Sequence, residues 1–127
     1  MTISDVQLPG DLLHDVVTQV CRAIPDDLEK VILYGSYARG EATDESDVDI
    51  MAVVDNGKEL EKTVRQIMVD ISYDLSLAYG VEVTVLLQDK DEYEQWQPYI
   101  PFLRNVNREG IVVYERTTAD TLPDNHI

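Results

Sequence analysis

Two carboxylates and a glycine-serine pair are the residues of this chain whose spacing most clearly suggests chemistry. Gly35 and Ser36 are followed, after ten residues, by Asp47-Val48-Asp49. Because side chains alternate along a strand, Asp47 and Asp49 would share one face and lie close together. Two like charges that close resist ionisation unless a cation lies between them, and Mg²⁺ takes one or two protein carboxylates together with phosphate oxygens and water. The pattern indicates metal-dependent chemistry on a phosphate compound, with a nucleoside triphosphate favoured.

The glycine-serine pair lies between two predicted strands. The apolar run 31–34 is typical of a buried strand that ends at Gly35, and a second strand is expected over Asp47–Val54. Ser36 is expected to cap a brief helix over Tyr37–Glu41, which leaves free backbone N–H groups where phosphate oxygens are favoured. The two strands would therefore place the carboxylates beside a phosphate-binding turn.

Other sites built from similar residues need neighbours that this chain lacks. A P-loop requires Lys directly after its second glycine, but Glu41 follows Gly40. A calcium loop that begins at Asp47 needs glycine at its sixth position and an acidic residue at its twelfth, where Ala52 and Lys58 stand. Phosphatases of the haloacid dehalogenase type end an apolar strand with Asp-x-Asp, whereas here the apolar residues follow the pair. An ordinary turn with two solvated aspartates would suit a lone Asp-x-Asp better than it suits this joint pattern.

At these residues the sequence resembles the DNA polymerase beta-like nucleotidyltransferase superfamily, whose signature is Gly-Ser, ten residues and Asp-x-Asp. Within it, the short chain is similar to the minimal nucleotidyltransferases (MNT proteins), several of which are antitoxins paired with a HEPN-domain toxin. The runs 36–41 and 105–111 are similar in style to those proteins, and the resemblance spans about Val31 to Tyr114. It implies an α/β fold with a small mixed β-sheet and helices mainly on one face.

The resemblance also implies three carboxylates at the site. Asp47 and Asp49 would hold two Mg²⁺ ions, and a third carboxylate on a neighbouring strand would act as a base or a further metal ligand. Glu82 is the candidate, because it is the only acidic residue of the predicted strand Val81–Leu87. Aspartate is the more usual residue there, and Glu82 could instead be an exposed residue at the start of a strand.

The phosphate-binding roles carried over from the resemblance fall on three residues. Gly35 allows the backbone to approach a phosphate closely, and Ser36 would bind the β/γ end of ATP through its hydroxyl and N–H. Arg39, one turn further along, would contact the triphosphate, although a solvated surface arginine explains it equally well.

The implied reaction is transfer of AMP from ATP to an acceptor hydroxyl, with release of pyrophosphate. A tyrosine of a HEPN toxin is the acceptor that the antitoxin resemblance implies. Two alternatives remain open: a cationic antibiotic, as in the aminoglycoside nucleotidyltransferases, and an antitoxin whose carboxylates are idle and which acts by binding alone. The sequence itself carries no code for the acceptor.

The charge of the chain limits its partners. Ten Lys and Arg residues against 25 Asp and Glu give a net charge of −15. Affinity for nucleic acid rests largely on basic residues that neutralise phosphates, so a polynucleotide is disfavoured as the direct substrate. ATP is not excluded, because magnesium screens its charge. The acidity favours a basic protein or a cationic small molecule.

Two further helices are predicted from apolar periodicity. The first covers Gly10–Ile24 and the second Lys58–Tyr79. The second carries the strongest amphipathic stripe of the chain, which is expected to lie in the core: Leu60, Val64, Ile67, Met68, Ile71, Leu75 and Ala78.

The segment after the third strand is expected to form two short helices and a last strand. The first helix covers Asp89–Gln97, Pro101 opens the second, and Ile111–Tyr114 is the strand. Phe102, Leu103 and Val106 are expected to face inward. Most of the large aromatic side chains gather in this stretch, where core packing is the default and a base-stacking wall or a partner surface are the alternatives.

The length and composition favour one domain over residues 1–116, followed by a loose tail over 117–127. The hydrophobic content of 44% is that of a globular protein. No apolar segment approaches the ~20 residues that span a bilayer, and the first residues lack the basic and apolar regions of a signal peptide. A cytoplasmic protein without membrane contact is therefore expected.

Overall fold

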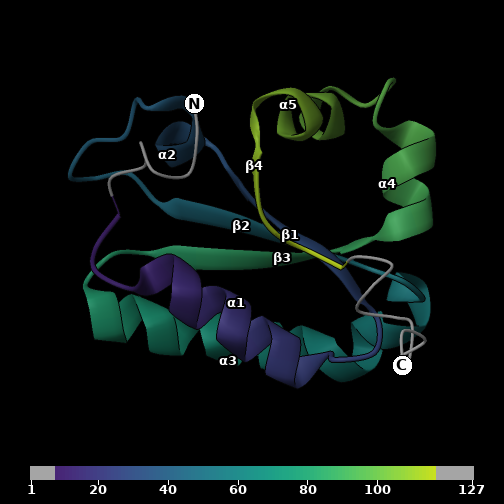
Figure 1. Ribbon diagram of the computed structural model, residues 1–127, viewed down its shortest axis with the longest axis horizontal. Coiled ribbons are helices and arrows are strands. Elements are labelled where there is room, and N and C mark those ends of the chain that lie inside the picture. Colours follow the sequence, from purple (N-terminus) through teal and green to yellow (C-terminus); the bar gives the residue numbers. More distant parts are fainter. Residues whose placement is uncertain (1–7, 117–127) are drawn as a thin grey trace, which may run out of the picture.

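The computed structural model describes residues 8–116. Four strands, β1 (Leu28–Tyr34), β2 (Val48–Val54), β3 (Val83–Asp89) and β4 (Ile111–Glu115), form one sheet in the order β3-β2-β1-β4 (Figure 1). β1 is antiparallel to both of its neighbours, whereas β2 and β3 are parallel. The predicted mixed sheet is confirmed. The strands predicted over 47–54 and 81–87 begin slightly later than expected, so Asp47 and Glu82 each precede a strand.

The two long helices cover one face of the sheet. α1 (Leu12–Ala23) and α3 (Gly57–Tyr79) lie side by side on this face, and α3 makes the crossover that parallel strands need (Figure 1). Their buried side chains form the main core with the inward-facing residues of the strands. The predicted stripe of α3 is confirmed except at Ile67, which is 39% exposed, and at Ala78, which is also exposed. Both residues lie at the edges of the buried face of α3, where side chains reach solvent.

The two short helices cover part of the opposite face. α4 (Lys90–Trp96) and α5 (Pro101–Glu109) bury Tyr93, Leu103 and Val106 against β1 and β2. Figure 1 shows both helices on the side of the sheet away from α1 and α3. Phe102 was expected to face inward, and this prediction is wrong, since its side chain remains 45% exposed.

The turn after β1 forms a single helical turn, α2 (Ser36–Arg39). Ser36 was predicted to cap this helix, but Gly35 is the N-cap residue and no side chain makes a capping hydrogen bond. Ser36 instead belongs to the helix, which leaves its hydroxyl free of a capping role. Gly40 ends the turn in the left-handed conformation that glycine adopts without strain.

Within residues 8–116, no helix combines the length and the apolar character that crossing a bilayer would require. The tail predicted over 117–127 lies outside the described residues.

Candidate functional site

Gly35 and Asp49 are in direct contact where β1 ends. Asp49 on β2 pairs across the sheet with Tyr34, the residue before Gly35. A Cβ atom added at Gly35 would lie 2.4 Å from Oδ2 of Asp49, and Gly35 has a φ of +82°. Glycine is required here both for the backbone conformation and for the space that the carboxylate occupies. The signature thus brings the turn and one carboxylate into contact.

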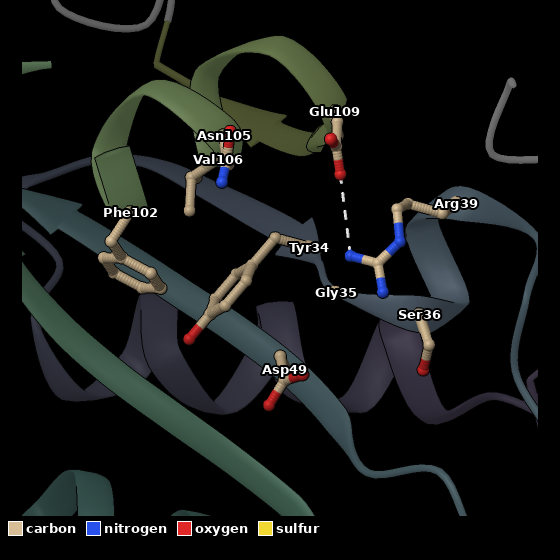
Figure 2. A pocket seen from close by; sticks show the side chains of 9 residues that line it. All are labelled: Tyr34, Gly35, Ser36, Arg39, Asp49, Phe102, Asn105, Val106 and Glu109. Atoms are coloured by element: carbon tan, nitrogen blue, oxygen red, sulfur yellow. Dashed lines mark ion pairs between the residues drawn. The ribbon is translucent and has the colours of Figure 1, made fainter. Parts of the chain in front are cut away.

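A cavity of about 380 Å³ opens at this contact (Figure 2). It is bounded by the end of β1, by α2, by β2 and by one side of α5. Its lining residues are Tyr34, Gly35, Ser36, Arg39, Asp49, Phe102, Asn105, Val106 and Glu109. Four of the six predicted site residues therefore share one cavity.

The other two predicted residues, Asp47 and Glu82, lie beside Asp49 without lining this cavity. The N–H of Val48 donates to the carbonyl oxygen of Glu82 at 2.8 Å, which aligns the starts of β2 and β3 and brings the two flanking acids together. Burial raises the pKa of Asp49, Asp47 and Glu82 raise it further, and Arg39 opposes the shift. Two exposed acids thus act on the partly buried Asp49.

This electrostatic arrangement suits a cation. Within residues 8–116, no group of three or more His, Cys, Asp or Glu side chains is arranged so that it could hold a metal ion by itself. Two carboxylates beside a phosphate-binding turn are nevertheless what Mg²⁺ takes when a nucleotide supplies further oxygens. The raised pKa of Asp49 means that Arg39 compensates its charged form only in part, and a divalent cation would provide the rest. Asp47 and Asp49 fit that role, and the part played by Glu82 stays a prediction.

Arg39 points into the cavity from α2 and is held there by two acids. Its Nε lies 3.0 Å from Oε1 of Glu41, and its Nη1 lies 3.5 Å from Oε1 of Glu109 on α5 (Figure 2). The hydrogen bond that Arg39 donates to Glu41 is the main cause of the raised pKa of Arg39, to which Glu109 adds. The guanidinium is 41% exposed, so its partners can be exchanged for a phosphate without opening the fold.

Tyr34 was not among the predicted site residues. Burial, and next the charge of Asp49, raise the pKa of Tyr34 to about 12, so its hydroxyl stays protonated and can donate a hydrogen bond into the cavity. Its ring meets that of Phe102 edge to face, with centroids 5.6 Å apart. Its place next to Gly35 was the available signal.

The contribution of α5 to the cavity was also missed. Asn105, Val106 and Glu109 reach the site because β4 pairs with β1 and so draws the preceding helix over the end of β1. Gly110 makes this approach possible, because a Cβ atom there would lie 2.5 Å from both the Ile32 side chain and the carbonyl oxygen of Val106. Local periodicity gives no information on such a long-range pairing.

Residues 13–113 match the family described as "Nucleotidyltransferase domain". The chain belongs to this family. The match includes every residue of the cavity and the three acids.

Relatives and solved structures agree with this membership. The nucleotidyltransferase is 36% identical over 90 residues to "Putative protein adenylyltransferase MJ0604" of Methanocaldococcus jannaschii, an alignment that covers 68% of this chain and 79% of the relative. Its fold is similar to a crystal structure of a putative nucleotidyltransferase from Sulfolobus solfataricus (TM-score 0.50, 22% identity, 84% and 79% of the two chains). It is also similar to a crystal structure of a toxin-antitoxin with AMP-PNP (TM-score 0.57, 18% identity, 86% and 77% of the two chains). The fold expected of an MNT protein is thus confirmed.

Proposed function

We propose that this nucleotidyltransferase transfers AMP from ATP to a hydroxyl group of a protein partner, and that the partner is a HEPN-type toxin modified on a tyrosine. The observation that carries the proposal is the contact of Gly35 with Asp49 inside a cavity that also holds Ser36 and Arg39. A phosphate-binding turn and a carboxylate for a metal ion act on the same phosphate chain only when they meet in this way. The relative named as a protein adenylyltransferase and the solved toxin-antitoxin support the choice of donor and partner.

In this proposal each residue of the cavity has a task toward ATP. Ser36 donates its hydroxyl and backbone N–H to the β/γ end of the triphosphate, and Arg39 exchanges Glu109 for a phosphate oxygen. Asp47 and Asp49 would hold Mg²⁺, which lowers the pKa of the acceptor hydroxyl and stabilises the pyrophosphate leaving group. The protonated hydroxyl of Tyr34 donates a hydrogen bond to the nucleotide in the cavity.

The bonds that change are those at the α-phosphorus of ATP. The acceptor oxygen forms a bond to this phosphorus while the bond to the β-phosphate oxygen breaks, so that the products are an AMP ester and pyrophosphate. The proton of the acceptor hydroxyl passes to a base, which we assign to Glu82 because it lies beside Asp49 at the open side of the two strands.

Purified protein, ATP, Mg²⁺ and the product of the adjacent gene test the proposal by mass spectrometry of the intact partner. A mass gain of one or more AMP units is expected, and it should be lost in Asp47→Ala and Asp49→Ala. Asp74→Ala, an exposed acid of α3, is the matched control and should transfer normally. A tight complex without any mass gain would favour neutralisation by binding, and modification of an aminoglycoside would favour the antibiotic-modifying alternative.

The role of Glu82 is tested separately. Glu82→Gln keeps the size of the side chain but cannot accept a proton or hold a metal ion as a carboxylate, so kcat should fall by about 10²-fold or more, with little change in ATP affinity. Glu45→Gln, an exposed acid of the loop before β2, is the control. Near-normal turnover of Glu82→Gln would remove Glu82 from the catalytic site.

A further inference from the structure

A second concavity adjoins the catalytic cavity. It has a volume of about 660 Å³ and is lined by Gln88, Glu92, Trp96, Tyr99, Ile100, Phe102 and Leu103. We call this set the aromatic groove. Phe102 lines both concavities, so they meet at this residue. The groove lies at α4, the start of α5 and the segment that joins them.

Large apolar side chains are concentrated on this surface. Trp96 is 44% exposed, Tyr99 73%, Ile100 41% and Phe102 45%. They follow one another within seven positions of the chain, which distinguishes them from single exposed apolar residues. Exposed Trp and Tyr beside a concavity are typical of the residues that dominate the energy of protein–protein interfaces.

We infer that the aromatic groove binds a segment of the protein that is modified, and that this segment has apolar side chains flanked by basic ones. The inference rests on the proposed function, because it places the acceptor next to the donor. An extended chain advances by about 3.3 Å per residue, so a segment in the groove can pass Phe102 and present a hydroxyl in the catalytic cavity. The groove thus fits the acceptor side of the reaction.

Charge decides the kind of partner. Among the described residues that line the groove, Glu92 is the only charged one, and its Oε2 lies 3.5 Å from Nζ of Lys58. The basic residues of α5, Arg104 and Arg108, do not line it. With a net charge of −15, a second copy of this chain and an anionic lipid surface are both repelled, whereas a basic protein is attracted.

The test uses the product of the adjacent gene and measures its binding without ATP. A variant that combines Trp96→Ala with Tyr99→Ala should bind the partner about tenfold or more weakly, because exposed aromatic side chains dominate the energy of such interfaces. The affinity for a non-hydrolysable ATP analogue with Mg²⁺ should stay within about twofold, since neither residue lines the catalytic cavity. The matched control combines Tyr73→Ala with Leu77→Ala on α3, whose side chains are 64% and 67% exposed in the other layer.

The outcomes separate this inference from the proposed function. If the groove variant binds the partner as the wild type does, or if only the α3 variant loses binding, the aromatic groove is not the binding site of the partner. The same holds if sedimentation shows that the groove holds a second copy of this chain. A wild-type complex that depends on the groove but transfers no AMP would sink the proposed function and leave the groove in place. A wild type that neither binds the partner nor transfers AMP to it would overturn both.

Discussion

Gly35 shows how one residue links the fold to the chemistry of this nucleotidyltransferase. Its missing side chain provides the space for the Asp49 carboxylate, and its positive φ directs the chain from β1 into α2. Neither requirement depends on the other, and glycine alone satisfies both. The residues that carry the chemistry are consequently sensitive to changes of a single methyl group.

Gly35→Ala should strongly reduce transfer because its new methyl group displaces Asp49. Gly80→Ala is the comparison, because it adds a methyl group at another glycine with a positive φ. Gly80 also has a positive φ, +70°, but a Cβ atom there would meet nothing within 4 Å. Gly80→Ala should cost about 1 kcal/mol of stability from backbone strain and keep its activity. Gly35, with φ +82° and ψ −158°, lies in a backbone region that is essentially restricted to glycine, whereas Gly80 is left-handed helical with ψ +20°. Gly35→Ala should therefore lose more stability than Gly80→Ala and also displace Asp49, so transfer should fall by about 10²-fold or more. Thermal unfolding and turnover of both variants check this, and equal activity would contradict it.

Asp49→Asn should stabilise the protein while it removes activity. The pKa of Asp49 is raised by burial, then by Asp47 and Glu82, against the opposing effect of Arg39. A carboxyl with a raised pKa favours folding below its ordinary value near 3.8 and loses this contribution as the pH rises through the folded value. At pH 7 without metal the charged Asp49 therefore opposes folding, and asparagine does not.

Thermal unfolding of Asp49→Asn and wild type checks this sign. The variant should unfold at the higher temperature at pH 7, and the difference should shrink as the pH falls toward 4. Transfer should fall by at least about a hundredfold, because metal-bound charge stabilisation of several kcal/mol is lost. Asp74→Asn is the control, and a lower unfolding temperature of Asp49→Asn at pH 7 would show that the assigned sign is wrong.

At the scale of elements, Asp89 holds two helices at the end of β3. Its Oδ1 accepts from the N–H of Gly57 at 2.8 Å, at the start of α3, and its Oδ2 accepts from the N–H of Glu92 at 3.0 Å, in the first turn of α4. Gly57 must be glycine for this contact, because a Cβ atom there would lie 2.7 Å from the Cα of Asp89. One carboxylate thus joins helices on opposite faces of the sheet.

Asp89→Ala should lower the free energy of unfolding by about 1–3 kcal/mol, since a helix cap contributes about 1 kcal/mol and two are lost. ATP affinity should be preserved below the unfolding transition, because Asp89 does not line the catalytic cavity. Denaturant titration measures the loss. Asp91→Ala, in the first turn of α4 but with no cap to lose, should change stability by less than half as much, and an equal loss would contradict the double cap.

The sequence predicted the helices and strands better than the contacts between them. Apolar periodicity, together with capping residues and proline, predicted each helix and strand of residues 8–116, because a stripe such as that of α3 is a local property. It failed for Phe102, which has the spacing of an inward residue but stands where α5 overhangs the edge of the core. Ser36 was wrongly predicted to be the cap. Gly35 takes that position with a positive φ, and it contacts Asp49, which is fourteen residues away and outside the reach of local sequence patterns. Asn105 enters the site through the pairing of β4 with β1, which periodicity does not encode, whereas Tyr34 could have been found from its place next to Gly35.

At the scale of the whole molecule, charge separates the two binding steps. In the proposed function, ATP would contact only the local groups of a small cavity, whereas a protein partner would meet the field of the entire acidic chain. A net charge of −15 should steer a basic partner toward it, and salt screens that field over about 10 Å at 0.1 M.

The association rate of the product of the adjacent gene should therefore fall by about tenfold or more between 50 mM and 500 mM salt, while its dissociation rate changes little. Stopped-flow mixing of the two proteins measures both rates. The variant that truncates Trp96 and Tyr99 provides the comparison, because it removes uncharged contacts. Its loss of affinity should appear as a faster dissociation rate. This change should persist at high salt, because salt does not screen apolar contacts. An association rate that does not depend on salt would show that the acidity of the chain serves solubility rather than partner recognition.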